Sequence, residues 1–201
     1  MTLTSSSEQQ AVIDQLMALN FHAFLRLISE LLDRMGYEDI RLSSRTGFVG
    51  RNRDGGFDLA ALKPVPGGQR RVLIQVKQYA PERAVYSRTV NELRGVCLQH
   101  VAAEAILITT SGFSPSVLPA QVASAALVPV RLIDGQYLAD LCALYRVGMR
   151  KEQTATGTRF GLDQSYFARL EQEYKGVARA MPGERKYIGV VVAVTPRKRR
   201  S

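Results

Sequence analysis

Three polar side chains near the middle of the chain have the types and spacing needed for chemistry on a phosphodiester. They are Asp58 and, further along, Gln75 and Lys77, which are two positions apart. A carboxylate and an amide carbonyl are oxygen ligands of the kind that Mg²⁺ prefers. A lysine ammonium can position and deprotonate an attacking water, or stabilise the charge that grows in the transition state. With the backbone carbonyl of Val76 as a further ligand, these residues predict metal-assisted hydrolysis of a phosphodiester.

A single hairpin is predicted to carry these side chains. Residues 57–62 and 71–79 are rich in apolar and β-branched residues and predict two strands. The prolines and glycines of residues 63–69 predict the connection between them. A connection this short favours antiparallel neighbours, so the candidate residues should lie on adjacent strands.

The pairing of the two strands decides which side chains meet. If it is centred on Gly67 and Gly68, Asp58 lies opposite Lys77 and one step from Gln75, on the same face of the sheet. The apolar side chains between them point to the other face, which a helix could cover. These apolar residues are Val72, Ile74 and Val76.

The flanking sequence alternates between predicted helices and strands. Apolar residues recur at helical spacing over residues 8–35, and Gly36 ends this helix. Further strands are predicted over residues 40–43, 105–110 and 128–133, and further helices over residues 85–101, 116–126 and 136–145. This alternation is typical of an α/β layered fold.

The C-terminal part carries most of the positive charge. The whole chain has a net charge of +9, and residues 146–201 hold 13 Lys and Arg against 5 Asp and Glu. Residues 151–161 indicate a polar linker, followed by a helix over about 163–181, a strand over about 186–194 and a basic tail. A basic extension on a nearly neutral core predicts an arm that binds nucleic-acid phosphates, with Lys198 and Arg199 as contacts. A solvated extension without that role is the alternative.

Composition excludes several classes of protein. With 46% hydrophobic and 22% charged residues, the chain is typical of soluble globular proteins, and no apolar run is long enough to span a membrane. The polar, Ser-rich N-terminus does not match a secretory signal, so a cytoplasmic location is expected. Cys97 and Cys142 lie far apart among apolar neighbours, which predicts reduced, buried thiols.

Five short motifs occur in order along the chain. They are GGFD at residues 55–58, IQVKQY at 74–79, LRG at 93–95, ILITTSGFS at 106–114 and LIDG at 132–135. Over about residues 21–148 the chain thereby resembles the Mrr-like (type IV) restriction endonuclease family. The resemblance implies a PD-(D/E)xK nuclease core, with a central mixed sheet flanked by helices, in which Gln75 replaces the usual acidic residue. It also implies double-stranded DNA as substrate and Mg²⁺, or Mn²⁺, as cofactor.

The same resemblance divides the chain and suggests a biological setting. Residues 1–148 would form the catalytic domain, and residues 149–201 a small basic α+β extension. Family members often serve in bacterial defence, and several cut DNA that carries modified bases. Because no winged-helix-like region precedes the core, a separate recognition subunit or the basic tail is expected to supply specificity. Cutting both strands requires two active sites, so a homodimer or higher assembly is expected.

One departure from the family concerns an acidic residue. The first helix of the family commonly carries Glu directly after Phe, but here Phe24 is followed by Leu25. Glu30 lies on the same helix, about 140° away from position 25, and is one candidate replacement. Asp54, in the loop before the hairpin, is another. The missing glutamate also supports an alternative, a nuclease-fold protein that binds DNA without cutting it, and a junction-selective nuclease is a third hypothesis.

Two loops are candidate phosphate contacts. Residues 43–56 contain Arg45, Arg51 and Arg53 beside the site, which either bind DNA phosphates or are solvated. Residues 109–112 contain three hydroxyls between a strand and a helix, which either face a phosphate or form a turn.

Overall fold

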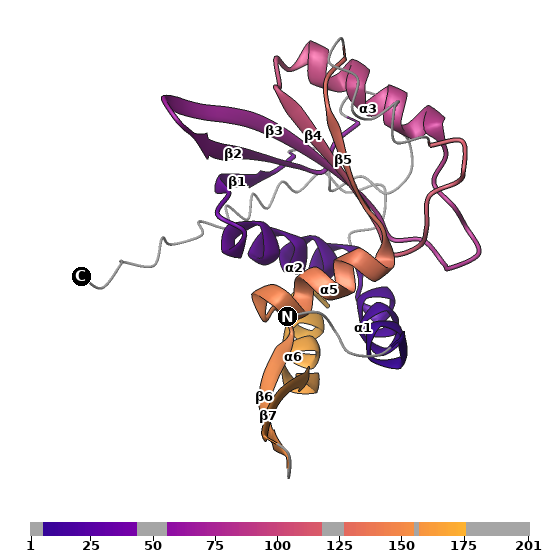
Figure 1. Cartoon of the computed structure of the whole chain (residues 1–201), viewed down its shortest axis with the longest axis vertical. Coiled ribbons are helices and arrows are strands. Elements are labelled where there is room, and N and C mark those ends of the chain that lie inside the picture. The colour runs from indigo at the N-terminus through magenta and orange to yellow at the C-terminus, as the bar shows by residue number, and fades with distance from the viewer. Residues whose placement is uncertain (1–5, 44–55, 118–126, 155–156, 176–201) are drawn as a thin grey trace.

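The computed structural model describes residues 6–43, 56–117, 127–154 and 157–175 and contains a five-stranded mixed sheet (Figure 1). The strands lie in the order β1 (Glu38–Leu42), β2 (Leu59–Val65), β3 (Gly68–Lys77), β4 (Glu104–Thr109) and β5 (Val130–Ile133). The first three are antiparallel neighbours, whereas β3, β4 and β5 are parallel. The predicted mixed sheet of an α/β fold is therefore confirmed.

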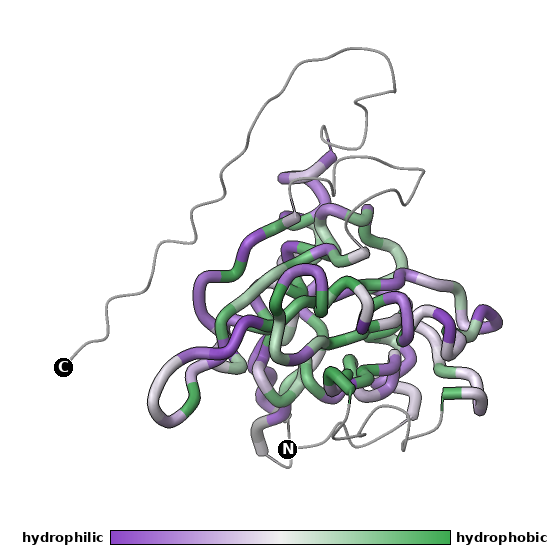
Figure 2. The backbone as a smooth tube through the Cα atoms, turned by 90° about the horizontal axis from the view of Figure 1, so that it is seen from above, coloured by the Kyte–Doolittle hydropathy of each residue, from purple (hydrophilic) through white to green (hydrophobic). Residues whose placement is uncertain are grey.

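Helices cover both faces of this sheet. On one face lie α1 (Ser6–Ala18), α2 (Phe21–Arg34) and α5 (Gly135–Tyr145), and on the other lies α3 (Ser87–Gln99) (Figure 1). Each face has its own hydrophobic cluster, and Figure 2 shows hydrophobic segments running through the centre of the molecule. The first cluster contains Val72, Ile74 and Val76, as predicted, packed with α2. Among the described residues, no helix is both long and apolar enough to cross a membrane.

The predicted helix over residues 8–35 is two helices, and the single-helix prediction is wrong. Asn20 separates α1 from α2 and is the N-cap of α2, where its side-chain oxygen accepts a hydrogen bond from the backbone N of Ala23 at 3.0 Å. Asparagine is among the residues preferred at this position because its oxygen satisfies an otherwise unpaired amide. Apolar spacing continues across the break, which is why periodicity alone did not reveal it. The α2 helix ends at Arg34, before Gly36, as predicted.

The hairpin is confirmed, but its register differs from the prediction by two residues. The pairing runs from Leu59 opposite Ile74 to Val65 opposite Gly68, so the turn consists of Pro66 and Gly67. Gly67 has a φ of +84°, and proline followed by a residue with positive φ suits a tight turn of this kind. The register brings Asp58 level with Gln75 rather than Lys77. Because a two-residue shift leaves the alternation unchanged, the facing of the side chains is preserved.

The C-terminal part contains more structure than its polarity indicates. A second, two-stranded sheet of β6 (Met149–Thr154) and β7 (Gly157–Leu162) replaces the predicted linker, which was wrong. Glu152 binds Arg150 and Arg159 at 3.1 Å each, so the polar residues serve an exposed hairpin. The next helix, α6 (Gln164–Tyr174), lies within the predicted range. The predicted strand and basic tail lie outside the described residues, as does most of the helix expected over 116–126.

The α6 helix shares the core of the sheet domain. Phe167 and Leu170 are 4% and 6% exposed and belong to the same hydrophobic cluster as α2 and α5. The carboxylate of Glu171 accepts a hydrogen bond from the backbone N of Asn20 at 2.9 Å. The first 148 residues are thus covered in part by side chains that follow them in the sequence.

Candidate active site

Asp58 directly precedes β2 and is held by both neighbouring strands. Its backbone N donates to the carbonyl of Ile74, and its own carbonyl accepts from the N of Ser43, both at 2.8 Å. Its side-chain Oδ2 accepts a hydrogen bond from the backbone N of Val76 at 2.7 Å. The carboxylate therefore lies against β3 beside the positions of the other two candidates.

The two residues before Asp58 pack closely under α3. Gly56 has a φ of +55°, and a Cβ at this position would lie 2.4 Å from Cγ2 of Val96. The ring of Phe57 meets His100 edge to face, with centroids 5.0 Å apart. Glycine is required here by both the backbone conformation and the close approach. Gly56 and Phe57 thus fix the path by which the chain delivers Asp58 to the sheet.

Gln75 and Lys77 share the face of β3 that is covered by α3, together with Leu73. Gln75 is only 7% exposed, and its Oε1 is buried with no hydrogen-bond partner among the described residues. Leaving a buried carbonyl oxygen unpaired costs about 1–3 kcal/mol, so such atoms are rare and call for a ligand or a functional role. The Oε1 atom of Gln75 is therefore the strongest indication of a ligand at this site.

These residues form a donor set that fits a hard divalent cation. The N–H of Val76 points toward Asp58, and in a strand the carbonyl of the same residue points to the same side. Asp58, Val76 and Gln75 thus offer a carboxylate, a backbone carbonyl and an amide oxygen. No group of three or more His, Cys, Asp or Glu residues that could hold a metal occurs in the described ranges. Mg²⁺ suits such a sparse set, since it keeps several waters and binds substrate phosphates.

Burial makes the charge of Asp58 costly. Loss of solvent raises the pKa of this carboxyl above its usual value, whereas the hydrogen bond from Val76 and the positive charge of Lys77 oppose that rise. A bound cation would favour the ionised form by the same electrostatic logic. The raised pKa of Asp58 and the unpaired oxygen of Gln75 thus both favour a bound cation.

The segment after Lys77 is braced by the hydroxyls at the end of β4. The carbonyl of Lys77 accepts from the N of Thr110 at 3.1 Å, and the hydroxyl of Thr110 donates to the carbonyl of Tyr79 at 2.7 Å. The hydroxyls of Thr109 and Ser111 form a hydrogen bond with each other at 2.9 Å. All three hydroxyl residues are buried, so they hold the turn rather than face a phosphate. Sequence reasoning left this open, and the strand register was the missing information.

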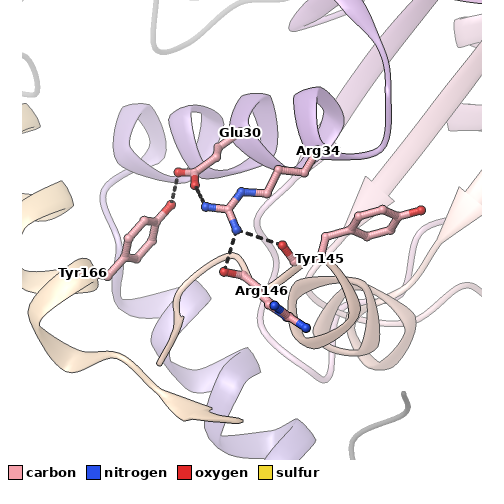
Figure 3. Close-up of polar contacts among 5 residues, drawn as sticks. All are labelled: Glu30, Arg34, Tyr145, Arg146 and Tyr166. Carbon is pink, nitrogen blue, oxygen red and sulfur yellow. Dashed lines mark hydrogen bonds and ion pairs between the residues drawn. The ribbon is translucent and has the colours of Figure 1, made fainter. Parts of the chain in front are cut away.

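Glu30 lies in a different network (Figure 3). Its carboxylate accepts a hydrogen bond from the hydroxyl of Tyr166 at 2.8 Å and pairs with Arg34 at 2.5 Å. Arg34 also donates to the carbonyls of Tyr145 and Arg146, at 2.9 Å each. Burial, followed by the nearby charge of Glu30, raises the pKa of Tyr166. The structure thus joins Glu30 to α6 and to the end of α5, and does not bring it to Asp58.

The remaining candidates fall outside the described residues. Arg45, Arg51, Arg53 and Asp54 belong to residues 44–55. Lys198 and Arg199 belong to residues 176–201. Their roles remain predictions from the sequence.

A mixed sheet between two helical layers, with Asp58 beside a strand that carries Gln75 and Lys77, defines a restriction-endonuclease-like core. The Mrr_cat family, described as "Restriction endonuclease", matches residues 16–142. The chain therefore belongs to this family, and the resemblance seen in the motifs is confirmed. No curated protein sequence matches the chain.

Two solved structures match this chain. One is "DNA modification-dependent restriction endonuclease AspBHI", with a TM-score of 0.56, 17% identity, and coverage of 89% of this chain and 42% of that one. Another is "MspJI Restriction Endonuclease in Complex with 27-mer Oligonucleotide", with a TM-score of 0.48, 23% identity, and coverage of 70% and 32%. The chain thus spans less than half of the length of either protein.

Proposed function

We propose that this chain is a metal-dependent endonuclease that hydrolyses phosphodiester bonds of double-stranded DNA. The observation that carries the proposal is the buried, unpaired Oε1 of Gln75, level with a carboxylate whose pKa burial raises. Both features favour a cation at this place in the sheet. Mg²⁺ is the expected cation, with Mn²⁺ as the alternative. Membership of the restriction endonuclease family supports DNA as the substrate.

In the proposed mechanism, each residue has a distinct task. Asp58 supplies the one negative charge of the donor set, and its hydrogen bond from Val76 fixes the direction of its carboxylate. Gln75 adds a neutral oxygen, so the site keeps more positive charge than one with two carboxylates. Half-buried Lys77 holds the attacking water, or the developing phosphorane-like charge, through its ammonium. When bound, the divalent cation would polarise the phosphate and make the water a better nucleophile.

The proposed biological role is restriction of foreign or modified DNA. The fold is similar to that of AspBHI, whose name describes a modification-dependent enzyme. This chain spans 42% of that protein. We propose that a separate subunit or the basic tail supplies recognition of a base or sequence. A homodimer or higher assembly is proposed because two strands must be cut.

The rival function is DNA binding without cleavage. It is favoured by the donor set itself, since Asp58 is its only carboxylate among the described residues. A site with so little negative charge would bind a cation weakly. The two hypotheses predict the same DNA affinity and differ only in cleavage.

The test is a cleavage panel of plain, methylated and branched duplexes with Mg²⁺ or Mn²⁺. We expect the wild-type chain to cut at least one of them, and Asp58→Ala and Lys77→Ala to lose activity by about 100-fold or more while still binding DNA. Lys151→Ala, an exposed lysine on β6, serves as the matched control and should cut normally. Absence of cleavage with every duplex and both metals would favour the rival.

A further inference from the structure

Arg83 lies on the turn that follows β3, the strand that carries Gln75 and Lys77. Its backbone N donates to the carbonyl of Ala80 at 2.9 Å, which closes the turn. The residue is exposed. It had no role in the sequence analysis because no local motif marks it. Three separate contacts nevertheless hold Arg83 and its turn in place.

The first contact is with an aromatic ring. The guanidinium carbon of Arg83 lies 3.9 Å from the centroid of the Tyr79 ring. Tyr79 is itself fixed, because its backbone N donates to the hydroxyl of Thr110 at 2.8 Å and its carbonyl accepts from the same hydroxyl at 2.7 Å. The ring also packs against the hydrophobic cluster under α3. The backbone of Tyr79 is therefore held in place, and its ring packs between the cluster and the guanidinium.

The second and third contacts anchor the turn that carries Arg83 to the segment that follows β4. The hydroxyl of Ser111 donates to the carbonyl of Arg83 at 2.7 Å, and Ser111 is bonded to buried Thr109. Val85, two residues further on, donates from its N to the carbonyl of Gly112 at 2.9 Å. The turn thus has the same support as the segment that follows Lys77.

The charge of Arg83 is not neutralised within the described part of the chain. No carboxylate there pairs with its guanidinium, although Glu82 precedes it in the sequence. By contrast, nearby Arg88 pairs with Glu92 at 2.8 Å. A guanidinium that stacks on a ring keeps its N–H edge free to form two parallel hydrogen bonds with a phosphate. Because its position is already fixed, binding would cost little additional entropy.

We infer that Arg83 binds a backbone phosphate of the DNA strand that lies at Lys77. The inference rests on the part of the proposed function that brings DNA to Lys77. The ligand is the phosphodiester itself, so the contact is independent of base sequence. Arg83 would set the position of the strand relative to Lys77, and it takes no part in the chemical step.

The test measures duplex DNA binding by the 201-residue chain without divalent metal, at salt concentrations of about 50 to 200 mM. We expect Arg83→Ala to reduce the slope of log affinity against log salt by about 1, the value for one lost phosphate contact. Arg83→Lys should keep the slope with weaker binding, since it retains charge but not the planar fork. Tyr79→Leu should weaken binding several-fold at an unchanged slope, since it removes only the aromatic ring.

Arg88→Ala is the matched control, an exposed arginine whose charge is already paired. It should leave the slope unchanged, and Arg83→Ala should melt at the wild-type temperature. An Arg83→Ala slope equal to that of the wild type, or a wild-type chain that binds no duplex, would overturn the inference. Failure of the wild-type chain to cut DNA, with the Arg83 slope effect intact, would instead count against the proposed nuclease activity alone.

Discussion

At the scale of single residues, Asp58 carries the main electrostatic cost of the site. Burial raises the pKa of its carboxyl. The hydrogen bond from Val76 and the positive charge of Lys77 together offset only part of this rise. The free protein therefore keeps a carboxylate that would be more stable in water or beside a cation. Sites of this kind trade stability for function, which gives a prediction that cleavage assays alone cannot provide.

The prediction is that Asp58→Asn stabilises the protein at neutral pH and abolishes cleavage. Asn keeps an oxygen that can accept from the N of Val76, but it carries no charge. A folded pKa above the unfolded one means that Asp58 contributes stability at low pH, and that this contribution is lost as pH rises through the folded pKa. The variant should therefore melt at a higher temperature than wild type at neutral pH. The difference should vanish below the unfolded pKa, about 3.9.

Thermal denaturation of both proteins at several pH values, without divalent metal, checks this. Lys151→Ala, far from the site, should follow the wild-type curve. An Asn variant that melts lower than wild type at neutral pH would mean that the charge of Asp58 is already compensated in the free protein.

At the scale of elements, the strands could be predicted from the sequence, but the exact pairing of their residues could not. The strands, the hairpin of β2 and β3 and the shared face of Gln75 and Lys77 follow from alternation and a short connection. The register did not follow, because residues 66–68 offer two adjacent turns and only the fold selects Pro66–Gly67. The unpaired oxygen of Gln75 was likewise invisible, since it depends on how α3 covers the strand. Arg83 was missed because its partners Tyr79 and Ser111 become neighbours only through the β3–β4 pairing.

Glu30 gives a prediction about elements, because it joins α2 to α6 (Figure 3). Tyr166→Phe should lower the free energy of unfolding by about 1–3 kcal/mol, since it leaves a partly buried carboxylate without one of its donors. Glu30→Gln should destabilise the protein to a similar degree. Its cleavage activity should equal that of the wild-type chain. Chemical denaturation and the cleavage assay measure these effects.

Tyr174→Phe is the control, because the structure records no hydrogen bond for that hydroxyl within the described ranges, and it should be nearly neutral. Loss of cleavage in a stable Glu30→Gln protein would instead restore Glu30 as a catalytic residue.

At the scale of the whole molecule, the family match and the core do not end at the same residue. The match covers residues 16–142, whereas Phe167 and Leu170 are buried in the cluster that contains α2 and α5. A division at residue 148 follows the change in composition along the sequence. Burial follows the packing of α6. Phe167 and Leu170 are three positions apart and lie on one face of that helix, but composition does not show which elements this face covers.

Two truncations test whether the domain ends at residue 148 or includes α6. A chain ending at Gly148 would expose the surface that α6 covers, and each large apolar side chain removed from the core contributes about 1.5–3 kcal/mol. It would also lose the Tyr166 and Glu171 hydrogen bonds. Since domains of this size are stable by only about 5–15 kcal/mol, we expect this chain to unfold at a much lower temperature or to aggregate. A chain ending at Lys175 keeps α6 and should melt like the 201-residue chain.

The second truncation also tests the role predicted for the basic tail. It removes Lys198 and Arg199 together with the other charges after Lys175, so duplex binding should weaken and its salt dependence should become flatter. If the chain ending at Gly148 is as stable as the one ending at Lys175, α6 is an independent appendage and the shared core contributes little. If the chain ending at Lys175 binds DNA with the affinity and salt slope of the 201-residue chain, the phosphate contacts lie on the core, where Arg83 and Lys77 are the candidates.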